Sequence, residues 1–131
     1  MLLFKPEHVK SIDECIKTQT RRTWKKARVT DDSIQKAKTK MLSKHYFALL
    51  RITEPPYQEK LRSLTEESAY AEGGYTVDSY IDKFYEINLK LDRENYAFLW
   101  LWVVKFEKVG PGNLPIDSPE FAPKTGKESP T

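Results

Sequence analysis

The sequence predicts an α+β fold: a small, strongly curved β-sheet or barrel with flanking helices. Runs of alternating polarity, typical of strands, are interspersed along the chain with runs that have the apolar spacing of helices. The 131 residues, 39% of them hydrophobic, suffice for one core of ordinary size but not for two comfortable domains. The longest apolar run, residues 97–104, is far too short to span a membrane, so we expect a soluble, cytoplasmic protein.

The first half of the chain predicts one helix and several strands. Residues 2–5 form a short strand, and Pro6 suits the first turn of a helix that apolar spacing extends to near Lys17. Pro55 and Pro56 interrupt the chain after these elements. The further strands are predicted over residues 19–24, 33–38 and 46–53.

Two helices and a central strand are predicted for the second half. Thr65 can cap a short helix that ends at Gly73 and Gly74. Thr76 begins a second helix, whose apolar stripe continues to Ile87. Residues 98–107 are apolar on both faces at their start, which predicts a strand through the middle of the domain.

The character of the sequence changes after Val109. Residues 110–131 contain five of the eight prolines and few large apolar side chains. Such a segment cannot bury enough surface to order itself, so we predict a domain over residues 1–109 and a Pro-rich tail that is disordered or lies extended over the domain. One hypothesis for function is therefore an interaction protein that binds a partner through this tail.

The net charge of +3 conceals an uneven distribution of charge. Residues 17–51 contain eleven Lys and Arg against two acids, whereas residues 52–109 contain seven bases against eleven acids. Neutralisation of phosphates is the main source of sequence-independent affinity for nucleic acids. The basic segment therefore predicts binding of a nucleic acid.

Composition excludes some kinds of site. The single cysteine, Cys15, excludes an internal disulfide, and His8 and His45 have no partners at a spacing typical of metal ligands. We therefore expect neither a metal nor a cofactor, and we expect a monomer.

Several motifs together resemble the ASCH domain family of the PUA-like superfamily. The motifs are Leu3-Phe4-Lys5, Lys17-Thr18-Gln19-Thr20-Arg21-Arg22, Leu64-Thr65-Glu66-Glu67 leading to Glu72-Gly73-Gly74, and the closing Val104-Lys105-Phe106. The resemblance covers residues 1–109. The family usually has a glycine just before the motif lysine, whereas this chain has Glu14-Cys15-Ile16.

The resemblance implies a PUA-like β-barrel with a cleft that binds RNA or a modified nucleoside. Some similar members are amidohydrolases that remove the acetyl group of N4-acetylcytidine with a lysine, a threonine and a glutamate. The matching residues here are Lys17, Thr20 and Glu72. We expect binding as the function, with deacetylation as the alternative, so whether the chain is an enzyme stays open. The expected ligand-binding residues are Lys17, Thr20, Arg21, Arg22, Trp24, Lys36, Lys38 and Lys40.

The positions of Lys17, Thr20 and Glu72 in the sequence are compatible with the chemistry of deacetylation. A threonine hydroxyl needs a base, and a lysine can serve only if burial or a nearby cation lowers its pKa. Arg22 shares a strand face with Thr20 and can supply that cation. Lys17 can reach Thr20 only from the helix end or turn before the strand, and Glu72 can then carry a proton or orient Lys17.

Overall fold

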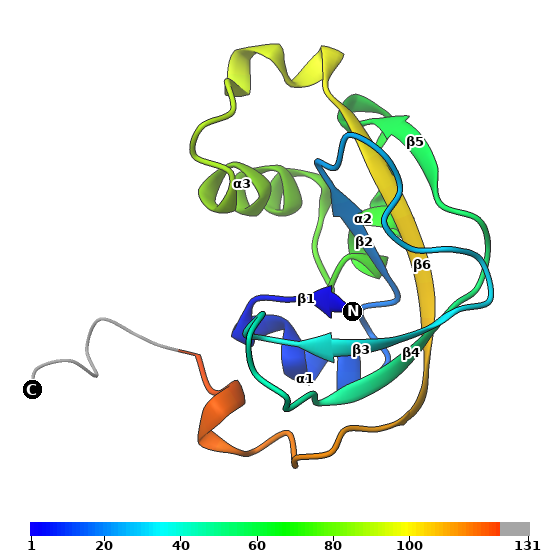
Figure 1. The fold of residues 1–131 in the computed structure, drawn as a ribbon. Helices are drawn as coiled ribbons and strands as arrows, with labels where there is room; N and C mark the ends of the chain where they lie inside the picture. The colour runs from blue at the N-terminus through cyan, green and yellow to red at the C-terminus, as the bar shows by residue number, and fades with distance from the viewer. Residues whose placement is uncertain (124–131) are drawn as a thin grey trace, which may run out of the picture.

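A mixed sheet of six strands curls into a half-barrel and forms the frame of the domain (Figure 1). The computed structural model describes residues 1–123, and of residues 95–97 it describes the backbone alone. The strands are β1 (Leu2–Leu3), β2 (Gln19–Arg22), β3 (Ile34–Lys38), β4 (Ala48–Ile52), β5 (Tyr57–Lys60) and β6 (Trp100–Pro111). Their order is β1-β3-β4-β6-β2, and β5 also pairs with β6.

Strand β6 is the central element, as predicted from its apolar sequence. Its first half pairs antiparallel with β2 and β5, and its second half with β4, across a register shift between Leu49 and Leu50. Leu101 belongs to one core cluster, whereas Val104 and Phe106 belong to the other. Because β6 contributes to both cores, its sequence is apolar on both faces.

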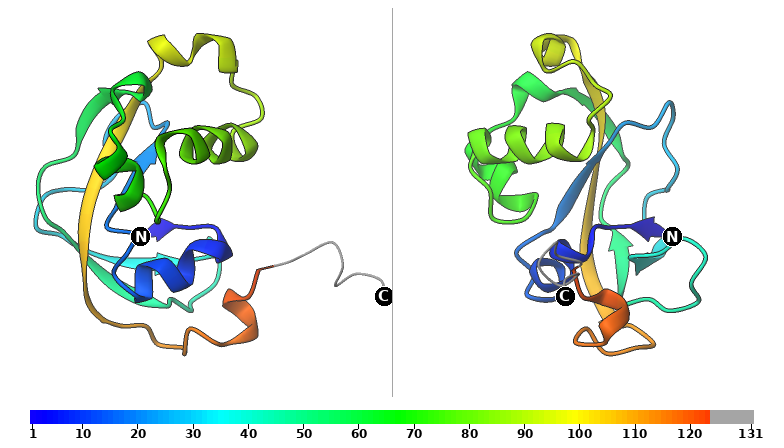
Figure 2. Two further views of the ribbon diagram at one scale, coloured as in Figure 1. Left: turned by 180° about the vertical axis from the view of Figure 1, so that it is seen from behind. Right: turned by 90° about the vertical axis from the view of Figure 1, so that its left-hand side faces the viewer.

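The helices gather at the two ends of the sheet (Figure 2). Helix α1 (Val9–Asp13), which follows the 3-10 turn η1 (Pro6–His8), lies at one end near η4 (Pro119–Phe121). The other end carries η2 (Leu61–Ser63), α2 (Glu66–Ala71), α3 (Val77–Ile87) and η3 (Arg93–Phe98). The predicted caps of α2 and α3 are confirmed, because the Thr65 and Thr76 side chains accept from the backbone N–H of Ser68 and Ser79. No helix within residues 1–123 is long and apolar enough to span a membrane.

In the first half of the chain, the predicted end of the first helix was wrong and one strand was not predicted. The first helix ends at Asp13 rather than near Lys17, since Cys15 adopts a left-handed φ of 60° and turns the chain. Strand β4 ends at Ile52, before Pro55 and Pro56, as predicted. These prolines are followed by β5, which was not predicted and which gains its hydrogen bonds from distant β6.

The chain continues past the predicted domain boundary at Val109 in one of the two forms predicted for the tail, extended over the domain. Strand β6 continues to Pro111, and the Phe121 side chain is 1% exposed and packs edge-to-face on Phe47 at 5.5 Å between ring centroids. Residues 110–123 therefore lie extended over the domain and complete its core. The rest of the predicted tail, 124–131, lies outside the described residues.

Candidate functional site

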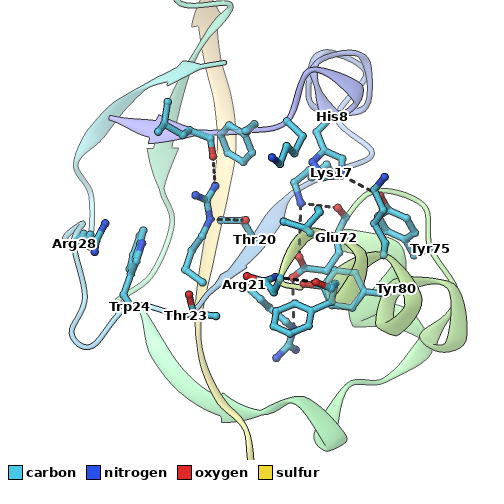
Figure 3. Close-up of a pocket in the computed structure, with 18 of the residues that line it drawn as sticks. His8, Lys17, Thr20, Arg21, Thr23, Trp24, Arg28, Glu72, Tyr75 and Tyr80 are labelled. Carbon is cyan, nitrogen blue, oxygen red and sulfur yellow. Dashed lines mark hydrogen bonds and ion pairs between the residues drawn. The ribbon is translucent and has the colours of Figure 1, made fainter. Parts of the chain in front are cut away.

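A cleft of about 710 Å³ opens between the β1–η1 segment, β2 and the α2–α3 region (Figure 3). Its lining includes Lys17, Thr20 and Glu72, which lie up to 55 residues apart in the sequence. The expected convergence of these three side chains on one cleft is therefore present. Arg21, Arg22 and Trp24 line the same cleft.

A tight turn places Lys17 at the inner end of the cleft. After Cys15 reverses the chain, the N–H groups of Ile16 and Lys17 both donate to the Ser11 carbonyl, at 2.9 and 3.0 Å. A left-handed φ at this position is one that glycine would adopt without steric cost. Lys17 leaves the turn pointing inward and is 3% exposed.

Glu72 lies at the C-terminal end of α2 and is almost fully buried, with 1% exposure. Gly73 and Gly74 follow it at φ 144° and 84°, which allows the chain to leave the helix sharply. The Lys17 Nζ donates to the Glu72 backbone carbonyl at 2.6 Å and lies 3.6 Å from its carboxylate Oε1. The lysine is thus held by two acceptors of one residue.

A polar network behind the cleft fixes the Glu72 carboxylate. Gln19 Nε2 donates to Glu72 Oε2 at 2.7 Å and to Ser68 Oγ at 2.8 Å. Arg21 Nε lies 3.6 Å from the same Oε2, while its Nη2 pairs with Glu59 at 2.7 Å. Both side chains come from β2, so the strand orients the acid at the end of α2.

The sequence alone did not identify Gln19 and Glu59 as members of this network. Gln19 occupies the variable position of the Lys-Thr-x-Thr motif, and its two-residue spacing from Arg21 was the available signal. Glu59 lies on β5, the strand that the sequence did not predict.

Thr20 presents its hydroxyl next to a cation. Arg22 Nε donates to Thr20 Oγ1 at 3.0 Å, and Arg22 Nη2 donates to the Leu3 carbonyl at 2.6 Å. The guanidinium therefore links β2 to β1 across the cleft. Within the described residues, no hydrogen bond joins Thr20 to Lys17, and the two side chains line the same cavity separately (Figure 3).

Burial changes the pKa values of several residues that line the cleft. It lowers the pKa of Lys17 to about 8, helped by the Arg22 charge and opposed by Glu72. Burial and the Lys17 charge lower the pKa of His8 to about 3, so this imidazole is neutral at physiological pH. Burial and the negative charge of Glu72 raise the pKa of Tyr80 well above its usual value. Lys17 therefore loses its proton more readily near neutral pH than an exposed lysine does.

Aromatic rings form a wall beside Glu72. Tyr75 packs edge-to-face on Tyr80 at 5.7 Å between ring centroids, and its hydroxyl is hydrogen-bonded to His8 Nε2 at 2.9 Å. All three side chains line the cleft. Such rings offer surfaces on which a nucleobase can stack.

The lysines predicted on the third strand lie apart from this cleft. The Lys36 ammonium lies over the Tyr46 ring at 5.2 Å, and Lys38 Nζ donates to the Ser43 carbonyl at 2.5 Å. Lys40 is exposed beyond the end of β3, and none of the three lines the cleft. The structure therefore does not bring them together with Lys17, Thr20 and Glu72. Within residues 1–123, no group of three or more His, Cys, Asp or Glu is placed to hold a metal.

Two solved structures share this arrangement of strands and helices. ASCH from Zymomonas mobilis superposes with a TM-score of 0.55 at 16% identity, covering 86% of this chain and 71% of that one. The chain has the ASCH fold. Protein EF3133 from Enterococcus faecalis V583, of the DUF984 family, matches with a TM-score of 0.61 at 17% identity, covering 87% of this chain and 85% of that one.

These matches confirm the predicted ASCH, PUA-like architecture at the level of the fold. No family model and no curated protein matches the sequence itself. At such low identity, activity has to be argued from the chemistry of the cleft.

Proposed function

We propose that this ASCH-fold protein binds a modified nucleoside in the cleft and hydrolyses an acyl amide on its base, as in N4-acetylcytidine. The buried Lys17–Glu72 pair beside Thr20 is the observation that supports this function best. A site that only binds a ligand gains little stability from a buried ion pair, because desolvation of the two charges offsets their attraction. A lysine with a pKa of about 8, by contrast, is suited to act as a base near neutral pH.

Lys17, Thr20 and Arg22 each have a separate role in the proposed hydrolysis. Neutral Lys17 has two N–H groups, which the two acceptors of Glu72 can receive, and a lone pair that can take the Thr20 proton. The Arg22 Nε donor stabilises the negative charge that develops on the Thr20 oxygen as its proton leaves. This oxygen then attacks the acyl carbonyl carbon, and the C=O electron pair moves onto the carbonyl oxygen, which gives a tetrahedral intermediate.

Collapse of this intermediate breaks the bond between the acyl carbon and the base nitrogen. The proton taken by Lys17 passes to the leaving amine, so free cytidine departs. Water, deprotonated by Lys17, hydrolyses the acyl ester on Thr20, releases acetate and restores the hydroxyl. The missing hydrogen bond between Lys17 and Thr20 is expected to form when substrate closes the site, as is common for ligand-free enzymes.

Binding of RNA without catalysis is the second candidate function. It is supported by exposed Lys25 and Arg28 at the cleft mouth, beside the aromatic ring of Trp24. The third candidate, binding of a partner through the tail, now depends on residues beyond the docked Phe121.

Incubation with N4-acetylcytidine, followed by chromatography, separates the first two candidates. We expect the protein to release cytidine, and Lys17→Met to lower the rate by at least about a hundredfold, because the base is lost. Lys26→Met removes an exposed lysine outside the cleft and is the matched control. Absence of cytidine with the unmodified protein would refute the hydrolytic proposal.

A further inference from the structure

The cleft is lined by far more positive than negative side chains. Seven of its described lining residues are Lys or Arg, and Glu72 is the one carboxylate among them. Lys17 and Arg21 are paired with Glu72, and Lys83 with Glu7 at 2.7 Å. The other cations of the cleft are Lys5, Arg22, Lys25 and Arg28. In the described part of the chain, no carboxylate lies within ion-pair distance of these four.

Two of the four uncompensated cations lie against one aromatic ring, and a third is adjacent in sequence and lines the same cleft. The guanidinium carbons of Arg22 and Arg28 lie 5.9 and 5.7 Å from the centroid of Trp24, and Lys25 is the next residue. Trp24 and Arg28 lie at the end of the cleft opposite Lys17 (Figure 3). The cleft therefore has a reactive end and a cationic end.

Like charges held this close repel one another. Burial lowers the pKa of Arg22 to about 10, and the Arg28 charge lowers it too, although Glu72 raises it. An anion between these side chains would remove the repulsion. A phosphate suits the position, because the exposed Arg28 guanidinium can bind it through paired, charge-assisted hydrogen bonds and Lys25 can add another. Arg22, whose Nε and Nη2 donate to Thr20 and Leu3, contributes its positive charge.

We propose that Arg22, Lys25 and Arg28 form a phosphate subsite, so that the substrate of the cleft is a phosphorylated nucleoside. The base would occupy the end with Lys17 and Thr20, and the ribose would connect the two ends. This inference rests on the proposed function for the position of the base. The phosphate belongs either to a free mononucleotide or to the backbone of RNA.

Calorimetric titration with cytidine and with cytidine 5′-monophosphate tests the subsite without any reaction. We expect the nucleotide to bind at least about tenfold more tightly, roughly the effect of one charge-assisted hydrogen bond. Lys25→Glu and Arg28→Glu should each remove this preference. Lys26→Glu reverses the neighbouring exposed charge outside the cleft, so it should keep the preference. Both replaced side chains are exposed, so thermal melting should show folded variants.

Equal affinity for cytidine and its monophosphate would refute the proposed subsite. It would also be refuted if Lys25→Glu and Lys26→Glu lost the preference for the monophosphate to the same extent. A cytidine trinucleotide that binds at least about tenfold more tightly than the monophosphate supports the subsite and assigns it to RNA. Equal binding of the two supports it and assigns it to a free nucleotide. The failure of the proposed function is distinguishable: the monophosphate would bind preferentially, yet neither N4-acetylcytidine nor its 5′-monophosphate would lose its acetyl group.

Discussion

Replacement of Lys17 by methionine should change how the stability of the protein depends on pH. Burial lowers the pKa of Lys17 from 10.5 to about 8 on folding, so the unfolded chain binds more protons between these two values. Stability contributed by this group therefore rises as pH increases through that window. Below pH 8, the folded protein bears the full cost of a buried charge.

The magnitude follows from the shift. Each pH unit well inside the window is equivalent to about 1.4 kcal/mol, and the gain between pH 7 and pH 9 is on the order of 1 kcal/mol. Lys17→Met lacks this gain. The difference in free energy of unfolding between the two proteins should thus change by about 1 kcal/mol over this range. The lowered pKa of Arg22, about 10, lies above it.

Urea denaturation followed by tryptophan fluorescence at pH 7, 8 and 9 measures this difference. Lys26→Met is the control, and its difference from the unmodified protein should not vary with pH, since that side chain is exposed. The kcat/KM for amide hydrolysis should rise up to about pH 8 as Lys17 loses its proton. A difference between the unmodified protein and Lys17→Met that is constant from pH 7 to 9 would refute the reasoning.

Three further changes test the structure itself. Phe121→Ala should lower the free energy of unfolding by about 3–5 kcal/mol, as expected when a large ring is removed from a core. Ile116→Ala, at a partly exposed side chain of the same segment, should lower it clearly less. Equal losses would contradict the docking of this segment. Cys15→Val should destabilise the fold by about 1–2 kcal/mol relative to Cys15→Gly, because a β-branched residue fits a left-handed φ poorly, and thermal unfolding measures it. Deletion of residues 110–131 should lower the melting temperature sharply, since it removes Phe121.

The sequence predicted the elements whose signals are local. Thr65 and Thr76 cap the helices they were expected to cap, because a cap depends on residues within one turn. Strand β6 was predicted because a strand that is buried on both faces has a nearly continuous apolar sequence.

Features that depend on distant partners were missed. Strand β5 is polar and exists because it pairs with β6, some forty residues later in the sequence. Phe121 is isolated in a Pro-rich segment, and only the folded core around Phe47 reveals its place. The same holds for the cleft. The motif identified Lys17, Thr20 and Glu72, but the network around Glu72 includes Glu59, which belongs to the unpredicted strand β5.

Comparison of Thr20→Ser with Thr20→Ala tests the proposed chemistry most directly. Serine keeps a hydroxyl next to Arg22, so it should retain turnover of N4-acetylcytidine within about tenfold. Alanine should lower kcat by at least about a hundredfold, with binding of the substrate nearly unchanged, since the hydroxyl makes the bond rather than holding the ligand. Thr18→Ala, outside the cleft on the same segment, should have no effect. If Thr20→Ala released cytidine as fast as Thr20→Ser, Thr20 would not be the nucleophile and the account would fail.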